Sequence, residues 1–302
     1  MDSNNLALGC QNGTVAVYSM NSGQLVGQHR EHMDQVSSLI SFAVKNSSFV
    51  CSSGHGTDPR IFVWDIAHSG PFLQLEGHSS SVTCMTIADS PRNLISGGAD
   101  NSLIIWDLVH TKKVQKLDAH NGTVSGIRYL PTINTIATAG WDNYIKLWGI
   151  ETSNDEFGKF VNNLNLCQSF DNGSSVLSMN SCQIDSTFLL AGSSNHRITV
   201  WNLSTGQREN ELETNTTANE IVLVENKFTF CSPDFMVLNT NSLDDPVGGL
   251  GGPGPEANAP TMGFNPRVQL LEMDTEKAYS LKLAKVGNVN SNGYCVNIYD
   301  II

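Results

Sequence analysis

The sequence has 302 residues and a formal charge of −12, from 17 Lys and Arg against 29 Asp and Glu, and only 15% of its residues are charged. An acidic surface repels phosphate backbones, so we expect no general affinity for nucleic acid. No apolar run approaches the ~20 residues that cross a bilayer, and residues 1–10 lack the basic and apolar segments of a signal peptide. We therefore expect a soluble protein of the cytoplasm or nucleus without a membrane partner.

Along the chain, short apolar runs end repeatedly in an aromatic residue. Trp64, Trp106 and Trp148 are evenly spaced, and looser copies of the pattern lie around Tyr18, Trp201, Val237 and Tyr299. These copies, seven in all, recur at a period of about 40 to 45 residues, with strand and turn signals inside each. Such a period is typical of a β-propeller built from four-stranded blades.

The third copy shows the expected strands most clearly. We predict the innermost strand in residues 81–90, the second in 93–98, the third in 102–108 and the outer strand in 112–118, with a turn at 99–101. Nearly continuous apolar character suits a sheet that neighbouring sheets cover on both faces. The chain is therefore predicted to be all-β, a single seven-bladed β-propeller of four-stranded antiparallel blades.

The predicted blades divide the whole chain. We place them at residues 1–30, 31–76, 77–118, 119–170, 171–213, 214–262 and 263–302. The first copy lacks an innermost strand and the last lacks an outer strand, so we expect degenerate first and last blades and an incompletely closed ring. Either the sequence is a fragment of a longer protein, or a partner supplies a strand by β-augmentation. Residues 149–165 and the Gly- and Pro-rich residues 244–260 are predicted to be mobile surface insertions.

Polar residues recur with the aromatic residue at fixed places in the two central copies. In the third copy they are Gly77, His78, Ser96, Asp100 and Trp106, and in the fourth they are Ala119, His120, Thr138, Asp142 and Trp148. This pattern resembles that of the WD-repeat family. The resemblance implies that the indole N–H donates to the hydroxyl, the hydroxyl to the imidazole and the imidazole to the carboxylate. Such a network satisfies every buried polar group in it. The acid after Trp106, Asp107, is expected to cap the following turn.

Other copies keep less of the pattern. The second retains three of its residues: His32, Asp58 and Trp64. Its turn is one residue longer, which leaves either Ser52 or Ser53 as the hydroxyl. The fifth copy offers Asn195 for the acid and Ala191 for the hydroxyl, and it has no evident histidine. The sixth and seventh copies keep only the strand alternation.

The sequence contains no recognisable catalytic site. It has neither a phosphate-binding Gly-x-x-x-x-Gly-Lys motif nor a Gly-x-Ser-x-Gly elbow. His29, Glu31, His32 and Asp34 are close enough in sequence to hold a metal, but His32 already fills the network position. An enzyme that used the central channel would need converging carboxylates or metal ligands, which the predicted inner strands lack. We therefore predict no enzymatic activity, no catalytic residue, no metal and no cofactor.

The candidate binding residues lie in loops on one face of the propeller. The resemblance implies that the loops into the innermost strands and the turns between second and third strands gather there, and that family members bind peptides on this face. Trp141, just before the turn residue Asp142, is expected to anchor a partner, because a turn aromatic is large and stiff. The alternative is that its ring packs over the adjacent blade. The other rim positions are Thr57, Ser81, Ala99, Thr123 and Ser194.

Together these features predict a non-catalytic scaffold or adaptor that binds protein or peptide partners on this face within a larger intracellular assembly. One alternative is a substrate-recognition subunit of a ubiquitin ligase, for which some relatives carry an Arg two residues after Trp-Asp. Here Ala67 and Val109 occupy those positions. Another alternative is that the chain is a fragment of a larger multidomain WD-repeat protein.

Overall fold

The computed structural model describes residues 5–45, 47–66, 71–181, 188–214, 217–218, 220–224, 227–231, 268–272 and 280–284. This part of the chain is all-β, as the sequence predicts. It forms antiparallel sheets and one short 3₁₀ turn at Pro131–Ile133, and it contains no α-helix.

Six antiparallel sheets follow one another along the described chain, and every strand pairs with its neighbour in sequence. The first sheet has three strands: β1 (Asn5–Gly9), β2 (Thr14–Ser19) and β3 (Leu25–Arg30). The second has four: β4 (Val36–Val44), β5 (Ser47–Gly54), β6 (Ile61–Asp65) and β7 (Pro71–Leu75). The third has four: β8 (Val82–Ile87), β9 (Asn93–Gly98), β10 (Ser102–Asp107) and β11 (Lys112–Asp118).

The remaining three sheets are also four-stranded. The fourth contains β12 (Val124–Leu130), β13 (Thr135–Gly140), β14 (Tyr144–Asp155) and β15 (Gly158–Asp171). The fifth contains β16 (Val176–Ser181), β17 (Phe188–Ser193), β18 (Arg197–Asn202) and β19 (Gln207–Glu213). The sixth contains β20 (Glu220–Val224), β21 (Lys227–Cys231), β22 (Val268–Glu272) and β23 (Ser280–Ala284).

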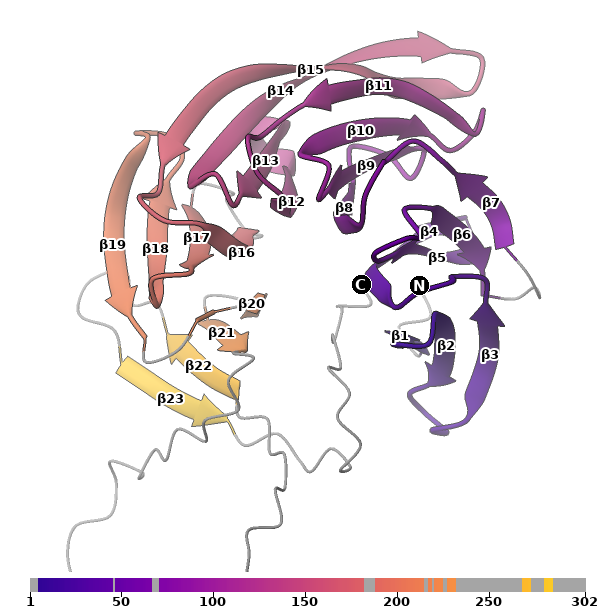
Figure 1. Ribbon diagram of the computed structural model, residues 1–302, viewed down its shortest axis with the longest axis horizontal. Coiled ribbons are helices and arrows are strands. Elements are labelled where there is room, and N and C mark those ends of the chain that lie inside the picture. The colour runs from indigo at the N-terminus through magenta and orange to yellow at the C-terminus, as the bar shows by residue number, and fades with distance from the viewer. Residues whose placement is uncertain are drawn as a thin grey trace, which may run out of the picture.

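The sheets are arranged like blades around a central space (Figure 1). In each four-stranded sheet the first strand lies nearest the centre and the fourth lies at the outer edge. In the first sheet, β2 carries Tyr18 where β6, β10 and β14 carry Trp, so its three strands correspond to the second, third and fourth strands of the others. The described residues form an arc of six sheets that does not close, whereas the repeats predict seven blades.

Burial explains why the central strands are so apolar. Every residue of β9 and β10 is buried, whereas the outer strand β11 alternates between exposed and half-buried residues. Apolar side chains fill the space between adjacent sheets: Ile105 of the third sheet and Ile127 of the fourth belong to one cluster. Each middle strand is thus covered on both faces, which removes the alternation expected of a half-exposed sheet.

Hydroxyl groups link the innermost strands of neighbouring sheets. Near the start of each of these strands a Ser or Thr donates a hydrogen bond to a backbone carbonyl of the next sheet or of the loop that enters it. The four described pairs are Ser37 with Val82, Thr83 with Val124, Ser125 with Val176, and Ser178 with Ala218. The first strand pairing of each sheet is irregular at this point. A β-bulge of this kind redirects a side chain, here toward the neighbouring sheet.

The turns between second and third strands share one backbone conformation. Asn101, Asn143 and His196 have φ of 64°, 74° and 63°, and Gly13 has φ of 81°. This left-handed conformation is most accessible to Gly and Asn. At Gly13 a Cβ atom would also lie 2.2 Å from the carbonyl oxygen of His32, so only glycine fits. The shared turn fixes the direction of the residues before it, including Trp141.

One predicted insertion is ordered, and the expectation of a mobile loop there was wrong. Residues 149–165 belong to the long hairpin of β14 and β15, which have 12 and 14 residues. Val161 and Leu164 of this hairpin are buried in the cluster between the third and fourth sheets. The polar residues on either side of these two anchors are mostly exposed, which is why the composition of the segment resembles that of a loop.

The sixth sheet differs from the predicted division of the chain. Its strands β22 and β23 come from residues 263–302, beyond the expected boundary at residue 262, yet they pair with β21 and with each other. No Trp marks a strand in this part of the sequence, so the repeat pattern contained no residue from which the strands could be placed. The predicted strands around Val237 and Tyr299 and the insertion at 244–260 lie outside the described residues.

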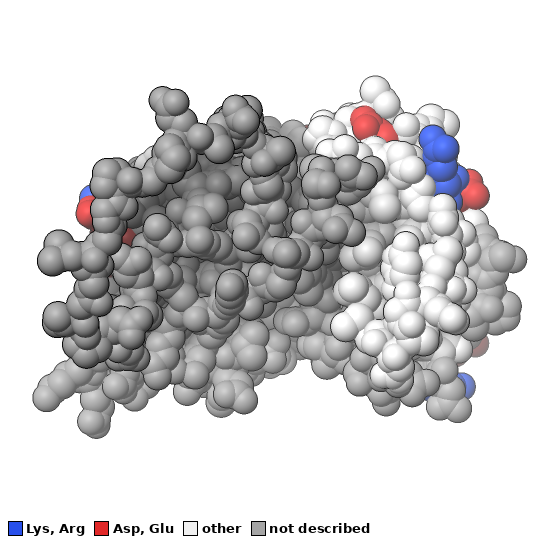
Figure 2. Space-filling model, turned by 90° about the horizontal axis from the view of Figure 1, so that it is seen from below, with Lys and Arg blue, Asp and Glu red and all other residues white. Residues whose placement is uncertain are grey.

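The described surface is mostly uncharged. In the view of Figure 2, uncharged residues cover most of the described atoms, in keeping with the low content of charged residues. The described part of the chain contains no helix long and apolar enough to cross a membrane.

Candidate protein-binding face

A hydrogen-bonded chain crosses the third sheet from its core to its loops. The Trp106 indole donates to the Ser96 hydroxyl at 2.8 Å, and that hydroxyl lies 2.8 Å from Nε2 of His78. Nδ1 of His78 lies 2.9 Å from the carboxylate of Asp100, which also accepts the backbone N–H of Ser79 at 3.0 Å. These are the four side chains that the repeat pattern brings together.

The fourth sheet repeats this geometry. The Trp148 indole donates to the Thr138 hydroxyl at 2.9 Å, the hydroxyl lies 2.8 Å from Nε2 of His120, and Nδ1 lies 2.9 Å from Asp142. Because the hydroxyl already accepts from the indole, its own proton points to Nε2, and Nδ1 carries the proton toward the acid. A neutral imidazole is therefore enough to complete the network.

Burial and hydrogen bonding set the charges of these groups. Burial lowers the pKa of His120, and Asp142 opposes this only in part. The same holds for His32 in the second sheet, where burial outweighs Asp58. Burial raises the pKa of Asp100, but hydrogen bonds from His78, Ser102 and the Ser79 amide outweigh it and hold the pKa well below its usual range. In the second and fourth sheets the network thus pairs a neutral histidine with an ionised acid.

In the second sheet the structure selects Ser52 as the hydroxyl. Trp64 donates to Ser52 at 2.7 Å, and Ser52 lies 2.9 Å from Nε2 of His32. Nδ1 of His32 lies 3.2 Å from Asp58. Ser53 faces the neighbouring sheet instead, where it bonds to the carbonyl of Val82. The longer turn therefore leaves the register of the network unchanged.

In the fifth sheet one asparagine replaces the missing groups, which sequence reasoning did not find. The side-chain oxygen of Asn172 accepts from the Trp201 indole at 3.1 Å and from the Thr199 hydroxyl at 2.7 Å, and its amide donates to Ser193 at 2.8 Å. Asn195 lies exposed in the turn and takes no part in this network. The position of Asn172 in the sequence could have revealed its role, because it precedes the innermost strand where the other copies have His.

Above these networks, the loops and turns form one continuous face. Each turn amide donates to the loop that enters its own sheet: Ala99 to Ser81, Trp141 to Thr123, and Ser194 to Ser175. Neighbouring sheets are also linked, because Ser81 accepts the amide of Gly56, the residue before Thr57, and Ser175 donates to the Trp141 carbonyl. The loops and turns that carry the six predicted rim positions are here called the binding face: Thr57, Ser81, Ala99, Thr123, Trp141 and Ser194.

The six positions differ in what they can offer a partner. Thr57 and Ser194 are exposed, and Ala99 and Thr123 are half-buried. Ser81 is buried and its hydroxyl is occupied by the Gly56 amide at 2.7 Å, so its side chain supports the face from below.

Trp141 is the largest of the six predicted residues of the binding face. The residue is 55% exposed. Its backbone is held at both ends, by the Thr123 carbonyl at 2.9 Å and the Ser175 hydroxyl at 2.8 Å. Tyr144, at the start of β14, is 39% exposed. A rigid turn thus presents an aromatic ring to solvent.

A second polar cluster lies at the opposite ends of the third sheet's strands, and sequence reasoning missed it. The buried guanidinium of Arg92 bonds to Asp107 at 2.7 and 2.8 Å and to Asp155, in the β14–β15 hairpin, at 2.6 and 2.7 Å. It also stacks on the ring of Phe160 at 4.7 Å. Asp107 caps the following turn as well, because it accepts the Val109 amide at 3.0 Å. The cluster ties the hairpin to the third sheet.

The same cluster contains a possible set of metal ligands. One ligand atom each from Asp107, His110 and Asp155 lie within 4.8 Å of one another. The Arg92 guanidinium already bridges both carboxylates. A divalent cation would have to share them with this positive charge, which favours a structural ion-pair network over a metal site.

Comparison with known proteins agrees with this geometry. Residues 70–107 and 111–149 match the family model described as "WD domain, G-beta repeat", and these segments contain the networks of Trp106 and Trp148. The chain is similar to one in the crystal structure of the mitotic checkpoint complex, with a TM-score of 0.65, 20% identity, and coverage of 76% of this chain and 69% of that one. It is also similar to the computationally designed Ika8 protein, with a TM-score of 0.59, 21% identity, and coverage of 78% and 67%.

At these identities the likeness to solved structures shows the fold alone. The search of curated proteins found no match to the sequence. Two segments nevertheless match the repeat model, and each contains a complete network of indole, hydroxyl, imidazole and carboxylate; the network of Trp64 in the second sheet lies outside them. Residues 70–107 and 111–149 are therefore WD repeats, as the sequence predicts.

Proposed function

We propose that this chain is a non-catalytic scaffold that binds a peptide or protein segment on the binding face. The single observation that supports this most is the exposed ring of Trp141 on a backbone fixed by its neighbours. Aromatic residues that are rigid and exposed are frequent energetic centres of protein interfaces. The WD-repeat fold is generally used for protein–protein interaction, which supports the same class of function.

The test is substitution of Trp141 by Ala. We expect loss of binding to a native partner with a nearly unchanged melting temperature, because the ring is exposed and the turn is held through backbone atoms. Binding is measured by comparing the proteins that co-purify with wild type and variant, followed by titration of the purified partner.

The matched control is Phe157→Ala, which removes an aromatic ring that is 57% exposed at the tip of the β14–β15 hairpin. It should bind like the wild type. If Trp141→Ala retains every partner at wild-type affinity, the binding face proposed here is incorrect.

A further inference from the structure

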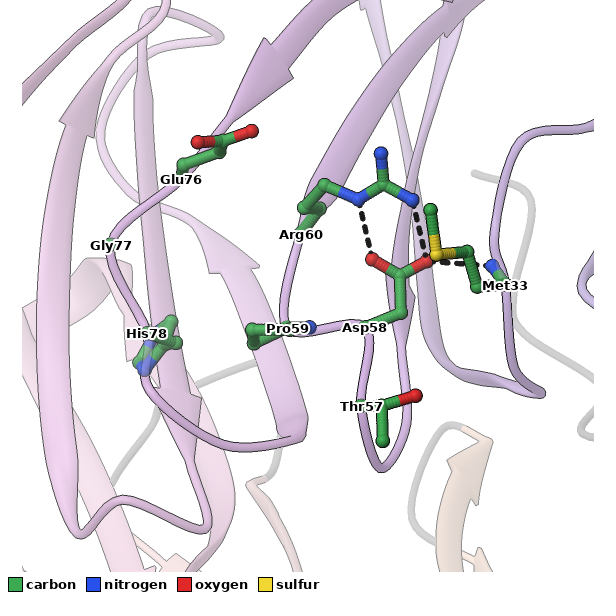
Figure 3. Close-up of a pocket in the computed structure, with 8 residues that line it drawn as sticks. All are labelled: Met33, Thr57, Asp58, Pro59, Arg60, Glu76, Gly77 and His78. Atoms are coloured by element: carbon green, nitrogen blue, oxygen red, sulfur yellow. Dashed lines mark hydrogen bonds and ion pairs between the residues drawn. The ribbon is translucent and has the colours of Figure 1, made fainter.

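A cavity of about 400 Å³ opens on the binding face between the second sheet and the loop that enters the third (Figure 3). Met33, in the loop before β4, lies on one side, and Glu76, at the end of β7, lies on the other. Pro59 and Arg60 lie between them, just before β6. Three loops that are distant in sequence therefore enclose one site.

Negatively charged side chains outnumber positively charged ones around this cavity. Both carboxylate oxygens of Asp58 bond to the Arg60 guanidinium, at 2.6 and 3.2 Å, and one of them also accepts the Met33 amide at 2.8 Å. The hydrogen bonds that Arg60 donates to Asp58 raise the pKa of Arg60, and the charges of Glu76 and Glu31 raise it further. Three acids thus surround one cation, and Glu76, which is exposed, faces the cavity from the side opposite Met33.

The apolar part of the cavity suits an alkyl chain. The Met33 side chain is 81% exposed, the highest exposure among the large hydrophobic residues of the described chain. Pro59 adds a second apolar surface to the lining of the cavity. An unbranched, polarizable Met side chain adapts to the shape of what it covers. Lys and Arg side chains combine a methylene stem with a charged end, and they bury the stem along such surfaces.

The rim of the binding face repeats the excess of negative charge. Asp118 and Asp171 lie at the top of the third and fourth outer strands, paired with Ser102 and Tyr144, and Glu76 follows the last pair of the second sheet. All three are exposed.

The nearby lysines are directed inward. Lys116 bonds to the Gly77 carbonyl and to Asp100, and Lys146 bonds to the Ala119 carbonyl. The face is therefore complementary to positive charge.

The geometry points to a basic partner segment for the binding face. A Lys or Arg side chain of that segment enters the cavity, with its methylene groups against Met33 and Pro59 and its charge beside Glu76. This inference rests on the proposed function, because it names the chemistry of the partner for the same face. It commits to a peptide, since the exposed acids of the rim repel the phosphates of nucleic acid and of anionic lipid.

The experiment selects random peptides on the immobilised full chain and compares their composition with that of the unselected library. We expect enrichment of Lys and Arg and depletion of Asp and Glu in the selected peptides. An enriched peptide is then synthesised and titrated against the variants. Glu76→Lys should weaken it by about tenfold, because a close opposite charge becomes a like charge. Met33→Ser should weaken it less.

The control for overall charge is Glu156→Lys, at the exposed tip of the β14–β15 hairpin, which changes the net charge by the same amount. It should leave the affinity unchanged. Selected peptides without a basic bias, or equal effects of the two Lys variants, would overturn the inference. If Trp141→Ala abolishes binding while Glu76→Lys does not, the proposed function survives and the inference fails. If Trp141→Ala has no effect on the selected peptide, the proposed function fails.

Discussion

At the scale of single residues, the acids of the networks matter because each satisfies several buried donors. Asp100 accepts from His78, from the Ser79 amide and from the Ser102 hydroxyl, the last at 2.7 Å. The His78 and Ser102 side chains that depend on it are buried. Removal of the acid therefore leaves donors without partners in a place that water does not reach, and an unsatisfied buried group costs more than a lost surface contact.

We therefore expect Asp100→Ala to lower the free energy of unfolding by about 1–3 kcal/mol. Chemical denaturation of purified protein measures this. Asp118→Ala, in the same sheet, removes an exposed acid and should change the stability by less than about 0.5 kcal/mol. Equal stability of the Asp100 variant and the wild type would show that the network is not structural.

The histidines make stability depend on pH. The folded-state pKa values of His32 and His120 lie below 6.5, the value expected in the unfolded chain, so the unfolded state binds more protons in mild acid. Their contribution is complete above the unfolded pKa and is lost as pH falls through the folded pKa. The depressed pKa values of Asp100 and Asp142 act in the same direction, but only as pH approaches 3.8 and below.

The melting temperature should accordingly be constant between about pH 7 and 8 and fall between about pH 7 and 5. Thermal unfolding followed by circular dichroism across this range is the measurement. His120→Gln should be less stable at pH 7 but show a smaller decrease with acid, because one titrating group is gone. An identical pH profile for variant and wild type would exclude His120 as a source of the effect.

At the scale of elements, the β14–β15 hairpin depends on Arg92. Replacement by Met leaves Asp107, whose side chain is 1% exposed, without its cation. Breaking a deeply buried pair costs about 3–5 kcal/mol, but here Asp155 is 30% exposed, so we expect about 2 kcal/mol. Denaturation measures the loss, and hydrogen exchange should show faster opening of the hairpin.

Lys159→Met is the control for the Arg92 variant. It removes an ion pair to Asp89 in which the lysine side chain is 47% exposed, and it should have little effect on stability.

The third sheet shows where the sequence predicts the strands correctly, and the β14–β15 hairpin shows where it does not. Three strands of the third copy, β9, β10 and β11, lie within one residue of the predicted ranges, because Trp106 and the Asp100 turn mark their ends, and β8 ends three residues earlier than predicted. Residues 149–165 carry no such marker, and their two anchors, Val161 and Leu164, are separated by polar residues. The fold of an outer-edge strand depends on what lies behind it, which a sequence does not display.

The candidate site was accessible to sequence reasoning only in part. The repeat places Trp141 in a turn, and the turn can be assigned to a face. That its ring is exposed, that Ser81 is buried, and that Met33 and Glu76 enclose a cavity all depend on contacts between sheets. Asn172 shows the same limit. Its side chain takes the place of both the histidine and the hydroxyl of the other networks, and only its contact with the Trp201 indole in the structure reveals this.

At the scale of the whole molecule, the described sheets are held together mainly through their faces and innermost strands. Apolar clusters fill the space between neighbours, and the hydroxyl of one innermost strand bonds to the carbonyl of the next sheet. Each sheet thus depends on the sheets beside it, as expected for repeat architectures, whose stability is a sum of units and interfaces.

The network of the fifth sheet differs from those of the second, third and fourth sheets, because it contains an asparagine in place of a histidine. An amide takes up no proton in mild acid, so the bonds from Trp201 and Thr199 to Asn172 persist where an imidazole would become charged. Acidification would therefore weaken the networks of Trp64 and Trp148, which depend on His32 and His120, before that of Trp201. The fifth sheet would then keep its hydrogen bonds at a pH that disrupts those of the sheet beside it.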